Sequence, residues 1–271
     1  MAMDRRIALK IAYDGCQFAG FSRQPGKKTV EGSIFAALRE IRAIRDPRSA
    51  KYRCASRTDA GVSAFGNVIS IDTSFPAEKL QRALNSRLED IWCTGIAILP
   101  EGFDVRHGAI SREYWYFMAK DDLNVERMQS CTELFLGEHD FSRYGRMDGR
   151  NPIRKILSFD ISETGRLILL RVKGESFLWN QVRRMAWAIE QVGKGCAEPD
   201  EISPEDYRLR RIGVAPAENL ILADVDIGFE FESNERNSKT LRDAMSKLVR
   251  LNVRTELLGR IIRDLSNGQI V

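Results

Sequence analysis

The order of strands and helices, which occurs twice along the chain, constrains the fold most. In the first half, the period-two segment IALKIAY (7–13) is followed by a helical stripe of apolar residues, and NVISIDT and IWCTGIAIL then enclose a second stripe. Near Phe103 the pattern begins again with AISREYWYFMAK. The uniform βα repeat of a barrel and the phosphate-binding glycines of a dinucleotide fold are both missing. The sequence therefore predicts an α+β protein.

We predict two similar subdomains whose mostly antiparallel sheets join across a central cleft, with helices on the outer face. The N-terminal unit spans 1–104, the C-terminal unit spans 105–232, and 233–271 forms a helical extension. In that extension, an amphipathic spacing links Leu241, Met245, Leu248, Leu258, Ile261 and Leu265, with a break near Asn252. The extension either packs on the body or lies at a subunit contact.

Local signals predict where the helices begin and end. In the first half, Thr29 is a plausible N-cap for a helix through Ile41, and Pro76 begins a second helix with a stripe reaching Leu88. The second half contains a helix over 123–137, a hairpin turning at Thr164-Gly165, a helix over 177–193 and a short helix starting at Ser203-Pro204.

Composition excludes several classes of protein. The five cysteines are scattered and never spaced as CxxC, which argues against a disulfide framework or a zinc site. With only His107 and His139 available, we expect no metal, and His139 reads as a structural side chain. MAMDRRIALKIAYD lacks the features of a signal peptide, and no charge-free apolar run is long enough to span a membrane. We expect a cytoplasmic protein without a membrane partner.

The net charge of +4 is small, but basic residues are concentrated between positions 39 and 57. Seven basic residues stand there against two acidic ones: Arg39, Arg42, Arg45, Arg48, Lys51, Arg53 and Arg57 against Glu40 and Asp46. A solvated helix face is the usual explanation of such a run, and a phosphate-binding approach to a site is the alternative.

The basic run leads into RCASRTDAGVSAFG (53–66), in which Arg57 and Asp59 flank one threonine. On its own, Asp59-Ala60-Gly61 reads as a turn in which the aspartate caps its own backbone and the glycine supplies a positive φ. The alternative is a carboxylate at the floor of a basic groove, held ionised by an arginine and suited to act as a nucleophile or general base on a sugar.

Together with its neighbours, this segment resembles the catalytic segment of the TruA family of tRNA pseudouridine synthases. The resemblance is carried by RTDAGVSA, preceded by YDGCQFAGFSRQ and TVEG, and then in order by FDVRHGAISREYWY, HDFSRY, NPIRKI, FLWNQVRRM, VGKG and APAENL. It runs from about Ile7 to Phe231. Several segments in the right order are far more specific than a single short motif.

The resemblance implies roles for particular residues. Asp59 is similar to the catalytic aspartate, Tyr114 to the active-site tyrosine that lies against the target base, and Arg183 to the helical arginine that pairs with the aspartate. Without the resemblance, Tyr114 would read as a core aromatic and Arg183 as a surface helix charge. Of the two arginines in QVRR, Arg183 is preferred to Arg184 because it adjoins the apolar stripe.

RNA-binding residues are also implied. Arg57 resembles the arginine that helps to displace the target nucleotide, and Gln24, Arg53 and Tyr114 are further candidates for contacts with the RNA. The cleft would then bind tRNA, with basic patches on phosphates and the target base turned out of its stack.

The implied reaction converts uridine to pseudouridine in the anticodon stem-loop, at positions 38–40 of the tRNA. It breaks the N1 glycosidic bond and joins C5 to the sugar without redox change, so it requires no cofactor. The resemblance also implies a homodimer. Two alternatives stay open: a synthase for other tRNA positions or other RNAs, and a noncatalytic RNA-binding protein that stacks bases on Tyr114, Trp115 and Tyr116.

The chain departs from the family pattern at two places near the aspartate. Ser63 stands where most relatives have histidine, which removes a possible polar contact beside the catalytic loop. Gly20-Phe21-Ser22 replaces GWQ or GFQ, which changes the loop that lines the RNA groove. These departures bear on the choice of substrate rather than on Asp59.

Overall fold

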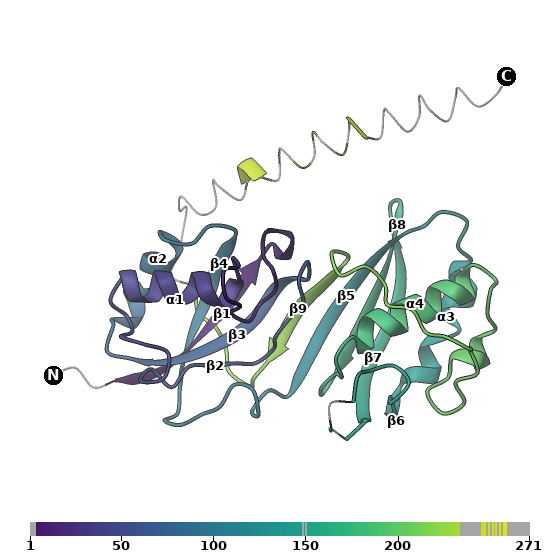
Figure 1. The fold of residues 1–271 in the computed structure, drawn as a ribbon, viewed down its shortest axis with the longest axis horizontal. Helices are drawn as coiled ribbons and strands as arrows, with labels where there is room; N and C mark the ends of the chain where they lie inside the picture. The colour runs from purple at the N-terminus through teal and green to yellow at the C-terminus, as the bar shows by residue number, and fades with distance from the viewer. Residues whose placement is uncertain are drawn as a thin grey trace.

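The computed structural model describes residues 4–147, 149 and 151–233, and, further on, 245–247, 249, 251, 253, 255, 257 and 258. The body is elongated, with one sheet running through both halves of the chain (Figure 1). Within the described residues, no helix combines the length and the apolar character needed to cross a membrane.

The first half contains β1 (Arg5–Tyr13), η1 (Gly15–Gln17), α1 (Val30–Glu40), β2 (Arg53–Cys54), β3 (Ser63–Thr73), α2 (Ala77–Asn85) and β4 (Ile91–Leu99). The second contains β5 (Ser111–Ala119), α3 (Val125–Gln129), η2 (Thr132–Phe135), β6 (Gly137–Asp140), β7 (Ile153–Thr164), β8 (Leu167–Gly174), α4 (Gln181–Gly193), η3 (Pro199–Ile202) and β9 (Leu220–Asp226).

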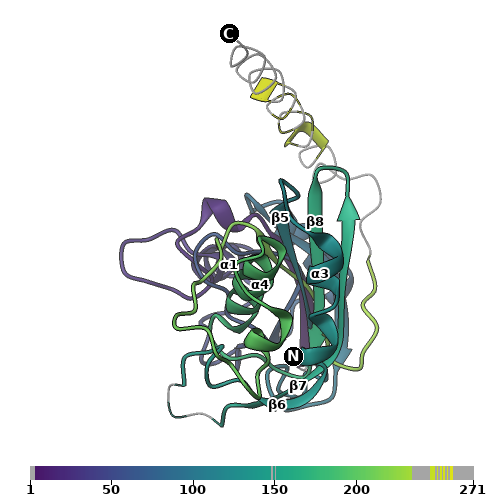
Figure 2. The same cartoon turned by 90° about the vertical axis from the view of Figure 1, so that its right-hand side faces the viewer.

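The nine strands of the described residues form one sheet in the order β4-β1-β3-β9-β5-β8-β7-β6, with β2 paired to β3. The short pairing of β3 with β9 is parallel, and the other pairings in the described part of the chain are antiparallel. Helices α1, α3 and α4 lie on one side of the sheet (Figure 2). The predicted α+β class with a mostly antiparallel sheet is confirmed.

Two apolar clusters lie under the helices. The first joins α1, through Ile34 and Leu38, to β1, and the second joins α4, through Met185 and Ile189, to β5 and β8. Strand β9 contributes to both clusters, with Leu222 in the first and Leu220 in the second. The division of the chain at residue 104 stays a prediction.

Several local predictions are confirmed. The Thr29 side chain accepts a hydrogen bond from Gly32 N at the start of α1, and Pro76 precedes α2. Helix α4 ends at Gly193 as expected, but it begins only at Gln181, so Leu178 precedes it. Leu88 likewise lies beyond the end of α2.

The single helix predicted over 123–137 is wrong. The segment forms the short α3, then η2, and Gly137, at φ 91°, begins β6 instead of ending a helix. Ser130 and Thr132 donate their hydroxyls to the carbonyls of Arg127 and Gln129. Such side-chain bonds to the backbone compete with regular helix, which explains the break.

Two other boundaries are corrected. Thr164 pairs with Leu167, so the hairpin turns at Gly165-Arg166 rather than at Thr164-Gly165. The short helix predicted to start at Ser203-Pro204 lies earlier in the chain. It is η3, which ends at Ile202 and has Ser203 as its C-cap. The signal for η3 is Pro199 at its first position inside a Glu198/Glu201 capping box.

In the C-terminal extension, Ser233 is not helical, but the described residues from 245 onward are. The side chain of Lys247 contacts the carboxylate of Asp90 and lies 5.3 Å from the Trp92 ring centroid. Met245 and Leu258, two members of the predicted stripe, are exposed. The other members, Leu241, Leu248, Ile261 and Leu265, and the predicted break at Asn252 lie outside the described residues.

Arg6 is a charged residue within the first half of the sheet and is only 6% exposed. Its guanidinium donates to Asp72 Oδ1 (3.0 Å), to Ser70 Oγ (2.8 Å) and to the carbonyls of Lys51 (2.8 Å) and Phe103 (3.0 Å). It therefore ties β1 to β3 and to two loops.

We expect Arg6→Met to lower the free energy of unfolding by about 3 kcal/mol, because it leaves a carboxylate and two carbonyls without their buried donor. Urea unfolding followed by circular dichroism measures this loss. The matched control is Arg5→Met at the exposed neighbouring position, which should change stability little. Equal effects of the two substitutions would contradict this account of Arg6.

Candidate active site

Buried residues of the first half of the chain contact the turn that carries Asp59 and fix its position. Tyr13 OH lies 2.8 Å from Thr58 Oγ1, and the fully buried Asn67 donates to Tyr13 OH at 3.3 Å. Phe21 N donates to Thr58 O at 3.1 Å. These contacts fix the backbone immediately before Asp59.

Two glycines allow the turn its shape. Gly61 has φ 86°, and Val62 N donates to Asp59 O at 3.2 Å, which closes the turn. Gly20 has φ 110°, and a Cβ there would lie 3.3 Å from Ala60 N, so the loop before α1 approaches the turn closely. The positive φ expected at Gly61 is confirmed.

The Asp59 carboxylate points away from its own turn and toward the other half of the chain. Arg183 Nη1 lies 3.4 Å from Oδ2, and Trp179 Nε1 donates to Oδ1 at 2.9 Å. The Asp59 side chain is 35% exposed, so it stays accessible from the cleft. Each carboxylate oxygen therefore has a donor, one from the first turn of α4 and one from the residue before its N-cap, Asn180.

The guanidinium of Arg183 is itself fixed. Its Nε donates to Ala215 O at 2.7 Å, and its Nη1 also donates to Asn180 Oδ1 at 3.1 Å. The adjacent Arg184 turns elsewhere and donates to the carbonyl of Arg143. The structure thus brings Arg183, and not Arg184, to Asp59.

Tyr114 lies on β5 and lines the same cavity as Asp59. Its ring meets Phe177 edge to face, with centroids 5.2 Å apart. Burial raises the pKa of Tyr114 to about 12, against a lowering by Arg112 and by a hydrogen bond with Ser56, while Asp59 adds a smaller rise. The phenol is therefore neutral at physiological pH.

The three neighbouring aromatic residues of β5 do not form one stacking surface. Tyr116 is only 2% exposed and belongs to the second core cluster. Trp115 packs against Phe65 instead and does not line the cavity. Tyr116 is therefore too buried to serve as the stacking platform predicted for it, and Trp115 lies on the opposite face of the strand from Tyr114, because successive side chains of a strand point to opposite faces.

The cavity around Asp59 is large, about 1050 Å³, and basic. Six cationic side chains line it against two acidic ones: Lys27, Arg57, Arg106, Arg112, Arg154 and Arg183 against Asp59 and Glu175. All seven basic residues of the run over 39–57 are exposed, but of these only Arg57 lines the cavity. The positive charge of the cleft thus comes mainly from other segments.

Of the three remaining candidates, Gln24 and Arg57 line the cavity and Arg53 does not. Gln24 lines it and donates to Ala19 O at 2.7 Å. Arg57 lines it too, and its interaction with the Cys54 thiol raises the pKa of its guanidinium. Arg53 is not among the lining residues and forms an ion pair with Asp104 at 3.2 Å.

Two residues of the site, Arg112 and Trp179, were not predicted from the sequence. Arg112 donates to the carbonyls of Ala55, Arg106, Ala109 and Glu175, and so ties together the loops around the cavity.

Trp179 contacts Asp59 directly. Trp179 stands four residues before Arg183, a spacing that would place both on one face of a continuous helix. Asn180, in the left-handed region at φ 64°, interrupts that helix.

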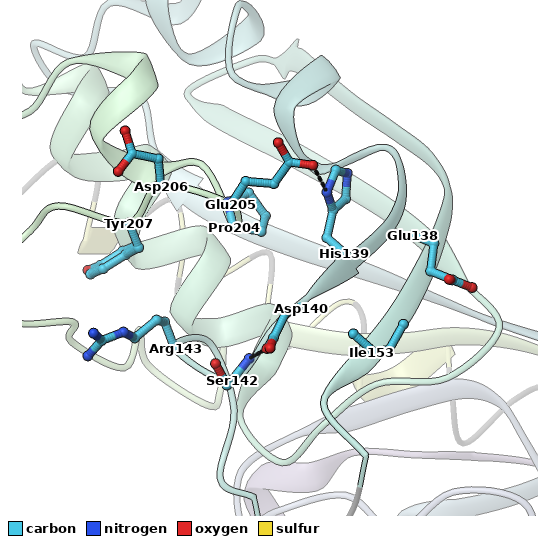
Figure 3. Close-up of a pocket in the computed structure, with 10 residues that line it drawn as sticks. All are labelled: Glu138, His139, Asp140, Ser142, Arg143, Ile153, Pro204, Glu205, Asp206 and Tyr207. Carbon is cyan, nitrogen blue, oxygen red and sulfur yellow. Dashed lines mark hydrogen bonds and ion pairs between the residues drawn. The ribbon is translucent and has the colours of Figure 1, made fainter.

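A second, smaller cavity of about 450 Å³ lies between β6 and the segment after η3 (Figure 3). His139 is at its edge, with Nδ1 3.2 Å from Glu205 Oε1 and Nε2 2.6 Å from Leu136 O. In the described part of the chain, no three His, Cys, Asp or Glu side chains are grouped for a metal ion. His139 thus links β6 to its neighbours, in agreement with the structural role expected for it.

Comparison with known proteins gives consistent matches. A family model described as tRNA pseudouridine synthase matches residues 132–227. The tRNA pseudouridine synthase A of Thermococcus sibiricus is 41% identical over 84% of this chain and 87% of its own. The enzymes of the same name from Thermococcus gammatolerans (37%, over 96% and 100%) and Methanosarcina mazei (38%, over 95% and 98%) are similar over nearly the whole chain.

Burial raises the pKa of all six tyrosines, to about 12 for Tyr114, Tyr116 and Tyr207 and further for others. The folded state therefore disfavours phenolate, so this contribution to stability is complete below about pH 10 and is lost as the pH rises toward and beyond 12.

We expect the folded protein to show little tyrosinate absorbance at about pH 10.5, where the unfolded chain should be more than half ionised. Absorbance near 295 nm, measured with and without denaturant, tests this. Native absorbance that matches the denatured sample would contradict the burial of these phenols. Tyr114→Phe should remove one phenol from the titration near pH 12.

Proposed function

The chain belongs to the tRNA pseudouridine synthase A (TruA) family, and we propose that it isomerises uridine to pseudouridine in the anticodon stem-loop of tRNA, with Asp59 as its catalytic residue. The tRNA pseudouridine synthase activity, an isomerase reaction, follows from the family. The catalytic residues and the uridines modified are the proposed part.

One observation supports the role of Asp59 above all. Its carboxylate is partly exposed in a basic cavity, and a cation from the other half of the chain fixes it there. A side chain that only capped a turn would face its own backbone. An accessible carboxylate next to a fixed guanidinium is suited to react with a ribose.

The reaction breaks the bond between N1 of uracil and C1′ of the ribose and forms a bond between C5 and C1′. The proton on C5 leaves to solvent and N1 gains one, so atoms balance without a co-reactant. Asp59 in its ionised form either attacks the sugar or removes the C2′ proton. In both routes Arg183 stabilises the negative charge of the carboxylate before the reaction.

Tyr114 and Arg57 have supporting roles in this proposal. The neutral phenol of Tyr114 lines the same cavity as Asp59, where it can contact the base that has left the stack. Arg57 lies two residues from Asp59 and lines the cavity, so it can occupy the space that the displaced nucleotide leaves. Gln24 and Arg53 are proposed as contacts with the RNA outside this centre.

The cationic lining supports binding of the tRNA backbone. Six cations around the cavity can replace the counterions of several phosphates and position the RNA by its shape. The proposal includes a homodimer in the cytoplasm, as the resemblance to the family implies. The noncatalytic alternative loses its main support, because Trp115 and Tyr116 offer no stacking surface in the cavity.

We expect Asp59→Asn to lower the rate of tritium release from tRNA labelled at uridine C5 by about 10³-fold or more, because the amide can neither attack nor accept the proton. Filter binding should show that the variant still binds tRNA. Asp160→Asn, at an exposed position of β7, is the matched control and should retain full activity. Normal release by Asp59→Asn would refute the assignment of Asp59.

Transcripts with single uridines distinguish the proposed substrate from its alternative. Carbodiimide labelling and primer extension should detect pseudouridine at positions 38, 39 and 40 but not in the T arm. Mass spectrometry of the unlabelled product cannot serve, because the isomerisation leaves the mass unchanged. Modification confined to other positions would favour a synthase with a different target.

A further inference from the structure

The indole of Trp179 makes the shorter of the two side-chain contacts with Asp59. Its Nε1 donates to Oδ1 at 2.9 Å, whereas Arg183 Nη1 lies 3.4 Å from Oδ2. The two donors bind different oxygens of the carboxylate. A carboxylate with one donor can rotate about its Cβ–Cγ bond, but two donors on separate oxygens fix its plane.

The surroundings of Trp179 hold the indole in this position. Arg146 N donates to Trp179 O at 3.1 Å, and the Arg146 guanidinium lies 4.9 Å from the centroid of the indole ring. Asn180, at φ 64°, then turns the chain into α4. The ring is thus fixed at its backbone and by a cation over one face, although it is 43% exposed in the cleft.

We propose that Trp179 is a positioning residue for the reaction, and that its N–H sets the orientation of the Asp59 carboxylate toward the ribose. This inference depends on the proposed role of Asp59. An indole is suited to the task because it donates one directed hydrogen bond without adding charge, and so it does not compete with Asp59 for Arg183 or attract a phosphate. The resemblance assigns roles to Asp59, Tyr114 and Arg183 but none to Trp179.

The first readout does not require activity. In a spectrum of the protein with ¹⁵N-labelled tryptophan, the Trp179 Nε1–H signal should be assigned by its loss in Trp179→Phe. Asp59→Asn should move that signal and speed its exchange with solvent, because the charged acceptor is gone. An unchanged signal would show that the bond is absent in solution, whatever the enzyme's substrate is.

The second readout is kinetic. Trp179→Phe should lower kcat for tritium release by about 10-fold, with KM and the Kd for tRNA nearly unchanged, since the loss of one charge-assisted bond disorients the reacting group without removing a contact to RNA. The matched control is Trp115→Phe. It deletes an indole N–H that also donates to a carboxylate, that of Glu113, but outside the cavity.

Benzothienylalanine at position 179 distinguishes the effect of the N–H from the effect of the ring's shape. Sulfur replaces the N–H in this analogue, while the bicyclic aromatic ring can still stack with Arg146. We expect it to lower kcat as Trp179→Phe does. Wild-type kcat with this analogue, or a loss seen only in KM, would overturn the positioning role. If the unmodified enzyme released no tritium from any tRNA while the spectral shift persisted, the proposed function and not the contact would have failed.

Discussion

The site depends on the insertion of β9 between β3 and β5. Asp59 precedes β3, Tyr114 lies on β5, and the first residue of β9, Leu220, lines the cavity between them. β9 pairs with β3 through only two residue pairs, Ser63↔Ile221 and Ala64↔Leu222, while its pairing with β5 is longer. A strand from late in the chain therefore sets the spacing of the two halves, and with it the meeting of Asp59 and Arg183, which are 124 residues apart.

The pair of Asp59 and Arg183 is better explained by chemistry than by stability. An ion pair with a partly exposed carboxylate contributes at most about 1 kcal/mol to folding. The buried Arg6, with four partners in β3 and two adjoining loops, is the kind of charge on which stability depends. Arg183 instead donates to Ala215, Asn180 and Asp59. These hydrogen bonds fix its guanidinium at an open cavity rather than in a core.

The sequence was sufficient for the parts of the fold that rest on local periodicity. The spacing of apolar residues close together in the sequence predicts the strands with a period of two and the α4 stripe that ends at Gly193. The α+β class follows from the order of these elements. The break between α3 and η2 was not predictable in this way, because hydroxyls inside an apolar stripe decided it. Trp179 was missed for another reason: its partner Asp59 is 120 residues away, and only the tertiary structure joins them. The segments at Asp59, Tyr114 and Arg183 were found through resemblance, and the structure places all three around one cavity.

The two departures from the family pattern act mainly behind the Asp59 turn. Ser63 Oγ accepts a hydrogen bond from Gly15 N at 3.0 Å, so serine retains a polar contact here, and the contact is with the loop after β1. A Cβ on Gly15 would lie 2.1 Å from Val62 O, which shows how closely that loop and the start of β3 approach. Phe21 is fully buried beside Tyr13, whereas Ser22 next to it lines the cavity and is only partly exposed. Of these positions, Ser22 is therefore where the departures change a side chain that RNA can reach, and Ser63 bears on the rigidity of the turn.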